Sequence, residues 1–242
     1  MKREDPFSVI LEDDRIIAVN KAAGITVGAD RWDESKERLD KLLEKKTGLR
    51  VFSVHRIDRD TSGLVVFAKD RETHRFLSEA FESRRVRKGY MAVVHGHVMQ
   101  GELTCDLPLV PDGDKQHRTI IDKYRGKRSF TRFRRLITAG NYSVVEALPE
   151  TGRTHQIRVH LASIGHPVVC DPLYGRASPK GVFLSSFKKG WRGDPLTERP
   201  LLDRLGLHAA SLILPDYDEL KAPLPRDMAA LLKQMEKCGV KD

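Results

Sequence analysis

The 242-residue chain is poor in cysteine and has no long apolar run. Its three cysteines, Cys105, Cys170 and Cys238, are odd in number and widely spaced, which argues against a disulfide framework and a cysteine-based zinc site. The nine histidines form no metal-binding pattern. No stretch approaches the ~18 apolar residues of a membrane span, and the N-terminus leads into no signal-peptide core. We therefore expect a reduced, soluble, cytoplasmic protein with no metal and no membrane partner.

Acidic residues are in the minority. The chain has 34 Asp and Glu against 43 Lys and Arg, a formal net charge of +9. Such an excess suits a polyanionic partner, nucleic acid above all. The 40% apolar content is enough for a packed core and excludes global disorder. The length allows one large domain or two small ones.

Short apolar runs of strand length recur in adjacent pairs and outnumber the helical patterns. Helices are predicted over 34–46, 71–85, 155–164 and 226–238 from apolar residues at helical spacing. This pattern favours an α+β fold with a mixed, mostly antiparallel sheet and peripheral helices. We expect a single domain over 1–242, in which 176–206, rich in Pro, Gly and basic residues, forms a long loop or insertion.

Basic residues are concentrated between positions 115 and 135. This stretch, the basic segment, has one acid, Asp122, and nine basic residues: Lys115, Arg118, Lys123, Arg125, Lys127, Arg128, Arg132, Arg134 and Arg135. Interleaved aromatic side chains, such as Tyr124, are typical of surfaces that combine phosphate contacts with base stacking. We predict that Arg125, Lys127 and Arg128 bind nucleic-acid phosphates. The alternative is a solvated hairpin.

Residues 54–69 place a charged loop directly before a buried strand. Asp58 lies in this loop near Arg56 and Arg59, and Thr61-Ser62-Gly63 leads into the apolar run 64–68. A loop anchored in this way is a rigid support for a functional side chain. A carboxylate beside guanidinium groups stays ionised, so it can serve as nucleophile, base or ion-pair partner. A surface loop with weak ion pairs is the alternative.

A second motif, Gly-Arg-Thr-His-Gln-Ile-Arg-Val-His, occupies residues 152–160. Together with His55-Arg56-Ile57-Asp58 and Thr61-Ser62-Gly63, it makes the chain resemble the RluA-type family of RNA pseudouridine synthases. The first motif differs from the family only by Ile57 in place of Leu. Weaker matches run from about Ile16 to about Leu224. The first lies at Lys21–Gly24, where Ala22 replaces the family's proline. The others are Lys88, Tyr90 and Ala92; Asp171, Tyr174 and Gly175; and residues 207–209.

The resemblance implies a pseudouridine synthase fold with a central catalytic cleft and no cofactor. It implies that Asp58 is the nucleophile, with attack on C1′ or C6 left open, and that Arg158 pairs with Asp58. Tyr90 would stack on the target base and assist proton removal from C5. Arg56 would fill the gap left by a flipped uridine, and Lys21 would lie near the cleft. Cys170 replaces a family glycine, and because both residues are small we expect little effect.

The expected partner is ribosomal or transfer RNA, bound by a monomer in which no S4-type RNA-binding module precedes the catalytic domain. Two rival functions remain. A glycosidase-like hydrolase commonly uses two carboxylates, and Asp60 lies near Asp58, but no second motif supplies an acid partner. A non-catalytic RNA-binding protein could keep the same fold, although an uncharged residue at position 58 would have favoured it.

Overall fold

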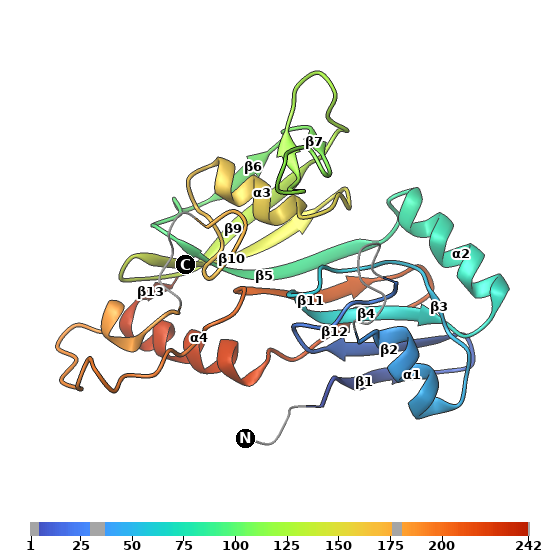
Figure 1. Cartoon of the computed structure of the whole chain (residues 1–242), viewed down its shortest axis with the longest axis horizontal. Coiled ribbons are helices and arrows are strands. Elements are labelled where there is room, and N and C mark those ends of the chain that lie inside the picture. The colour runs from blue at the N-terminus through green and yellow to red at the C-terminus, as the bar shows by residue number, and fades with distance from the viewer. Residues whose placement is uncertain (1–4, 30–36, 176–180, 242) are drawn as a thin grey trace. The chain divides into compact units, whose positions relative to one another are not determined.

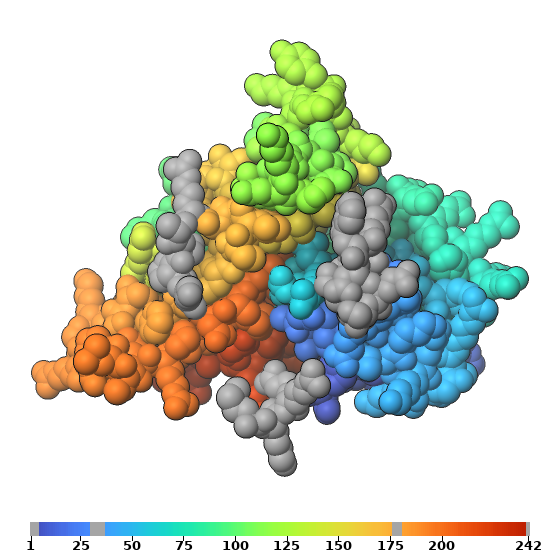
Figure 2. All heavy atoms as spheres, viewed as in Figure 1, coloured from blue at the N-terminus to red at the C-terminus, as the bar shows by residue number. Residues whose placement is uncertain are grey.

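The computed structural model describes residues 5–29, 37–175 and 181–241. The chain divides into two compact units. Unit 1 consists of Met1–Lys88 and His208–Leu224, and unit 2 consists of Gly89–Leu207 and Pro225–Asp242. Figure 1 labels the strands and helices of each unit, and Figure 2 shows the same view with all heavy atoms as spheres.

Unit 1 is built on a sheet in the order β1-β2-β4-β11. β3 pairs with β4, and β12 pairs with β11. The β1–β2 and β2–β4 pairs are antiparallel, whereas β11 runs parallel to β4, with His208 opposite Ser62. The elements are β1 (Phe7–Glu12), β2 (Ile16–Lys21), α1 (Leu39–Thr47), β3 (Phe52–Ser53), β4 (Ser62–Ala68), α2 (Arg71–Glu82), β11 (Leu207–Ile213) and β12 (Leu220–Lys221).

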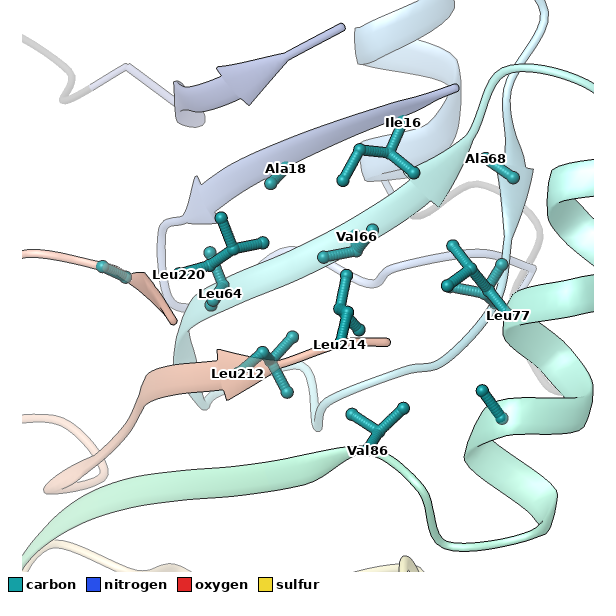
Figure 3. Close-up of a cluster of buried hydrophobic side chains, with 13 residues drawn as sticks. Ile16, Ala18, Leu64, Val66, Ala68, Leu77, Val86, Leu212, Leu214 and Leu220 are labelled. Atoms are coloured by element: carbon teal, nitrogen blue, oxygen red, sulfur yellow. The ribbon is translucent and has the colours of Figure 1, made fainter. Parts of the chain in front are cut away.

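The core of unit 1 lies between this sheet and helix α2. Alternate residues of the strands, among them Ile16, Leu64 and Leu212, are buried with Leu77 of α2 (Figure 3). All seven residues of β4 are buried. The helix begins where the Asp70 carboxylate accepts the Thr73 backbone N–H at 2.8 Å, which satisfies a free donor of the first turn.

Unit 2 has an antiparallel sheet in the order β5-β10-β9-β13, with β6 added to β9. Helix α3 packs on this sheet through Ile157 and Leu161, against residues such as Val94 and Val145. The elements are β5 (Arg87–His95), β6 (Glu102–Cys105), β7 (Leu109–Val110), β8 (Ile120–Ile121), β9 (Thr131–Ala139), β10 (Tyr142–Pro149), α3 (Gln156–Ser163), the 3-10 helix η1 (Leu184–Ser186), α4 (Arg226–Cys238) and β13 (Val240–Lys241).

The predicted α+β fold with a mostly antiparallel sheet and four helices is confirmed. The first helix begins at Leu39, and positions 34–36 of the predicted helix lie outside the described residues. The second helix ends at Glu82, three residues earlier than predicted. Between 181 and 206 the structure has η1, an isolated antiparallel bridge between Val182 and Leu202, and otherwise irregular chain. The single-domain expectation stays a prediction. No helix in the described ranges is both long and apolar enough to cross a membrane.

Candidate active site

The loop that carries Asp58 is fixed at its end by a close approach of two strands. Gly63 has φ +116, and a Cβ at that position would lie 2.2 Å from the Ala209 carbonyl oxygen. Only glycine fits here without strain. Next to it, the buried Ser62 hydroxyl lies 3.0 Å from Nδ1 of His208, whose Nε2 lies 3.2 Å from the Ala222 carbonyl oxygen. Because a carbonyl can only accept, Nε2 carries the hydrogen, and the serine donates to Nδ1.

A second anchor holds the loop just after Asp58. The Arg59 carbonyl accepts the Gly24 backbone N–H and the Lys21 ammonium, both at 2.9 Å. The Arg59 Nε–H in turn donates to the Gly24 carbonyl at 3.0 Å. Lys21 is buried and also donates to the Ala22 carbonyl at 2.8 Å. Lys21 therefore supports the Asp58 loop, a role that the sequence analysis missed, and its contact with RNA stays a prediction.

The side chain of His55, the first residue of the first motif, accepts a hydrogen bond from the backbone. Its Nε2 accepts the Val66 N–H at 2.9 Å, and its ring stacks on Phe81 at a centroid distance of 4.6 Å. Burial, with a smaller effect of the Lys88 charge, lowers the pKa of His55 to about 3. Part of the residue's surface is exposed, but Nε2 can accept the Val66 N–H only while the ring is neutral. Beside it, Arg56 is exposed and Asp58 is half-buried.

Tyr90 and Arg158 belong to unit 2. Tyr90 is half-buried on β5, opposite Ala147 of β10. Arg158 is buried on α3, and its Nε and Nη2 donate to the two oxygens of the Asp171 carboxylate, each at 2.8 Å. Burial alone would raise the pKa of Asp171, but the hydrogen bond and charge of Arg158, with two backbone N–H groups, lower it overall. The pairing of Arg158 with Asp58 stays a prediction.

Asp171 is a site residue to which the sequence analysis gave no role. Its Oδ1 also accepts the backbone N–H groups of Leu173 and Tyr174, at 2.9 and 3.1 Å. The sequence did contain a signal for it, because Asp171 is one of the weaker matches to the family, together with Tyr174 and Gly175. The sequence did not show that Arg158 is the ion-pair partner of Asp171.

Two further polar residues of the second motif, Gln156 and His160, tie α3 to the sheet. The Gln156 side-chain amide donates to the Phe130 carbonyl and the Thr131 hydroxyl, both at 3.0 Å. Its oxygen accepts the Thr151 hydroxyl at 2.7 Å. His160 is fully buried, with Nδ1 2.9 Å from the Thr131 hydroxyl and Nε2 3.0 Å from the Leu107 carbonyl oxygen. These contacts fix the helix that carries Arg158.

Part of the basic segment is occupied by internal ion pairs. Arg118 pairs with Asp114, Arg125 with Asp122, Arg132 with Glu150 and Arg134 with Glu146. The backbone and side-chain hydrogen bonds of Arg125 lower the pKa of Asp122 to about 2. Exposed cations of the segment for which the structure gives no ion pair within the described residues are Lys115, Lys123, Lys127 and Arg128. Tyr124, beside them, is 99% exposed.

Within the described ranges, no group of three or more His, Cys, Asp or Glu side chains is arranged to hold a metal ion. The family model for RNA pseudouridylate synthase matches residues 15–163. The chain is 35% identical over 95% of its length to ribosomal large subunit pseudouridine synthase D of Zymomonas mobilis, and covers 73% of that protein. It is 36% identical over 86% of its length to the dual-specificity RNA pseudouridine synthase RluA of Vibrio vulnificus, and covers 78% of it.

Among solved structures, human RNA pseudouridylate synthase domain containing 4 has the same fold. Its TM-score is 0.73 at 22% identity, over 95% of this chain and 93% of that chain. The fold, the family model and the two relatives agree with the two motifs around Asp58 and Arg158. The chain belongs to the RluA-type RNA pseudouridine synthases, which are isomerases.

Proposed function

We propose that the protein converts particular uridines of structured ribosomal or transfer RNA into pseudouridine, with Asp58 as the nucleophile. The observation that carries this proposal is the anchoring of the Asp58 loop. The loop is tied through Arg59 to Gly24 and Lys21, and the strand that follows it is tied through Ser62 to His208. A carboxylate held in this way is oriented before the substrate arrives, which is how enzymes lower the entropic cost of reaching a reactive geometry.

The reaction breaks the glycosidic C–N bond, turns the base over and joins C5 to C1′. Nothing leaves and no electrons are gained or lost, so the chemistry requires no cofactor. Asp58 attacks C1′ or C6 of the uridine. Tyr90 stacks on the base and assists loss of the proton from C5, and Arg56 occupies the place of the flipped nucleotide. Arg158 pairs with Asp58 and keeps it ionised.

RNA binding is assigned to exposed cations of the basic segment. Lys127 and Arg128 are exposed and follow the 99% exposed Tyr124 closely in the sequence, so phosphates and an unpaired base could be bound by the same segment. Arg125 is exposed as well, but its guanidinium is already bonded to Asp122 at 2.7 Å. We therefore give Arg125 a smaller share of binding than Lys127 and Arg128. The protein is proposed to act as a monomer.

The test has two arms. Pseudouridine mapping across the RNA of cells with and without the gene should identify the sites that disappear. Purified protein incubated with transcripts containing those sites should restore them with no added cofactor. Release of free uracil would instead support the glycosidase-like hydrolase, and tight RNA binding without either product would support a pure binding protein.

A further inference from the structure

The hydroxyl of Tyr174 is shared between two segments of unit 2. One is the hairpin segment, residues 109–121, in which β7 and β8 pair antiparallel. The Tyr174 oxygen accepts the backbone N–H of Thr119 in this segment at 2.9 Å. The same oxygen lies 2.9 Å from Nδ1 of His155, the residue that precedes α3. A phenol oxygen that accepts one hydrogen can still donate its own, so both contacts can form at once.

The ring of Tyr174 covers Arg158. The guanidinium carbon lies 5.2 Å from the ring centroid, within the range of a cation–π contact. Asp171, three residues earlier, holds the same guanidinium in its plane through two hydrogen bonds. The turn from Asp171 to Gly175 therefore fixes Arg158 from two sides.

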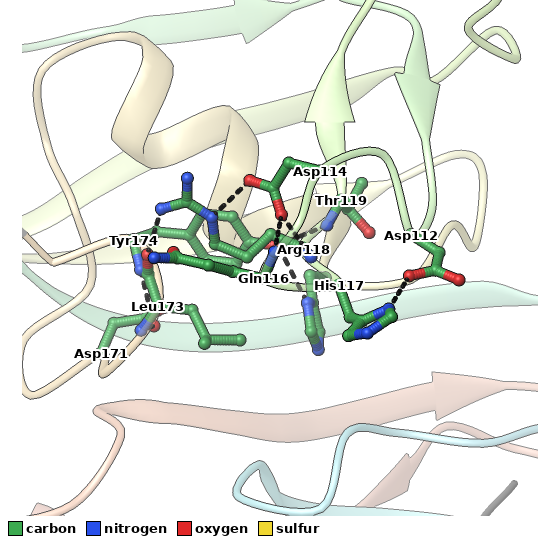
Figure 4. Close-up of polar contacts among 10 residues, drawn as sticks. Asp112, Asp114, Gln116, His117, Arg118, Thr119, Asp171, Leu173 and Tyr174 are labelled. Atoms are coloured by element: carbon green, nitrogen blue, oxygen red, sulfur yellow. Dashed lines mark hydrogen bonds and ion pairs between the residues drawn. The ribbon is translucent and has the colours of Figure 1, made fainter. Parts of the chain in front are cut away.

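A second contact joins the hairpin segment to this turn. Arg118 Nη1 donates to the Leu173 carbonyl at 3.3 Å, while its Nε donates to Asp114 at 2.7 Å. The other oxygen of Asp114 accepts the backbone N–H groups of Gln116 and Arg118. Figure 4 shows these residues and those of the turn side by side. The loop of the hairpin is thus ordered internally and touches the turn at two points.

We propose that Tyr174 is a positioning residue that links the hairpin segment to the Arg158 side chain. Its hydroxyl holds the hairpin in the orientation that binds RNA, and its ring holds the guanidinium in the orientation that the reaction uses. The inference rests on the proposed function, because it takes RNA as the ligand of the neighbouring basic segment and Arg158 as a participant in the reaction. It also gives Arg118, a cation of the basic segment, a role inside the protein, because its guanidinium donates to Asp114 and to the Leu173 carbonyl.

Two substitutions separate the functions of the hydroxyl and the ring. Tyr174→Phe keeps the ring and removes the hydroxyl, so RNA affinity should fall about fivefold, the factor expected for one net hydrogen bond. The rate at saturating RNA should change less than about twofold, because the ring still covers Arg158. Tyr174→Leu removes both and should lower the saturating rate about tenfold or more, the upper range of a desolvated cation–π contact.

Two readouts and one control variant distinguish positioning from a merely structural role. The slope of log affinity against log salt should be unchanged in Tyr174→Phe, because no cation has been removed. Exchange of the Thr119 amide hydrogen should accelerate, because its acceptor is gone. Tyr217→Phe is the matched control, since its hydroxyl is bonded to Asp13 in unit 1. It should leave affinity, saturating rate and Thr119 exchange unchanged, even where both variants lower the thermal midpoint equally.

Unchanged RNA affinity in Tyr174→Phe would overturn the hydroxyl's part of the proposal, and an unchanged saturating rate in Tyr174→Leu would overturn the ring's part. If the parent protein makes no pseudouridine, the proposed function fails, but the exchange measurement still tests the link. Equal Thr119 exchange in parent and Tyr174→Phe would then reject the link by itself.

Discussion

Arg158 and Asp171 form a two-pronged ion pair inside unit 2, with both N–O distances at 2.8 Å and both side chains almost wholly removed from solvent. Burial of two charges is costly unless the geometry is good and the remaining acceptors are used. Here the carboxylate also accepts two backbone N–H groups. The pair therefore fixes the orientation of an arginine that lies in the second family motif.

Breaking this pair should be costly to stability. Arg158→Met leaves Asp171 buried without its cation and should lower the free energy of unfolding by ~3–5 kcal/mol, measured by urea denaturation. Most activity should also be lost. Arg158→Lys should recover only part of the stability and part of the activity, because an ammonium cannot make the two-pronged contact. Full activity in the lysine variant would mean that this position needs only a charge.

Asp58→Asn should abolish turnover while leaving the fold intact. The two side chains are nearly isosteric, but a neutral amide is not a nucleophile. RNA affinity, measured by filter binding, should stay within about twofold, because the loop is anchored through neighbouring residues and not through the carboxylate alone. Pseudouridine formation should fall below detection in a tritium-release assay. Measurable product from the purified asparagine variant would remove Asp58 from the role of nucleophile.

The lowered pKa of His55 predicts a stability change with pH. In the folded protein this pKa is about 3, against ~6.5 in the unfolded chain. Below pH ~6.5, His55 is protonated in the unfolded chain but stays neutral in the folded protein. The free energy of unfolding therefore falls as pH falls from ~6.5 toward 3. Each pH unit costs up to ~1.4 kcal/mol. Urea unfolding of the parent and of His55→Gln, whose amide oxygen can accept the Val66 N–H, should show a smaller slope in the variant. Identical slopes would mean that His55 titrates normally.

How much of this could be read from the sequence depends on the distance between partners along the chain. The turn into β4 was predictable because an apolar run follows Gly63 directly. The hydrogen bond between Ser62 and His208 was not, because it joins residues 146 positions apart through the parallel pairing of β4 and β11. Asp58 and Arg158 were singled out by the two motifs, and their catalytic roles stay predictions. The role of Lys21 as a support for the Asp58 loop depends on a tertiary contact with the Arg59 carbonyl, which no local pattern reveals.

The backbone at Cys170 explains why the family has glycine there. Cys170 has φ +56, in the left-handed region where a side chain costs ~1–2 kcal/mol. The expectation of little effect considered only the size of the two residues and not this conformation. Cys170→Gly should raise the free energy of unfolding by a net ~0.5–1 kcal/mol, because glycine also makes the unfolded chain more flexible. Cys170→Ala is the control: it keeps the Cβ and should give no gain. A gain in both variants would assign the effect to the thiol.

The last prediction concerns which cations of the basic segment bind RNA. Lys127 and Arg128 are exposed, and the structure gives them no ion pair within the described residues, whereas Arg132 and Arg134 are paired with Glu150 and Glu146. A cation that contacts a phosphate releases counterions and adds about 0.7 units to the salt slope for single strands. Replacing Lys127 and Arg128 with serine should weaken binding and flatten the slope of log affinity against log salt by up to ~1.4 units.

Replacing Arg132 and Arg134 with serine removes the same formal charge and is the matched control. Its slope should change less, because these cations already have carboxylate partners. Adding Arg125→Ser to the first variant should flatten the slope further, but by clearly less than the ~0.7 units of one full phosphate contact. The reason is that Arg125 is already bonded to Asp122. The rate at saturating RNA should stay near that of the parent in all three. Equal slopes in the two double variants would mean that net charge alone attracts the RNA, and a lost saturating rate would mean that the segment shapes the active site.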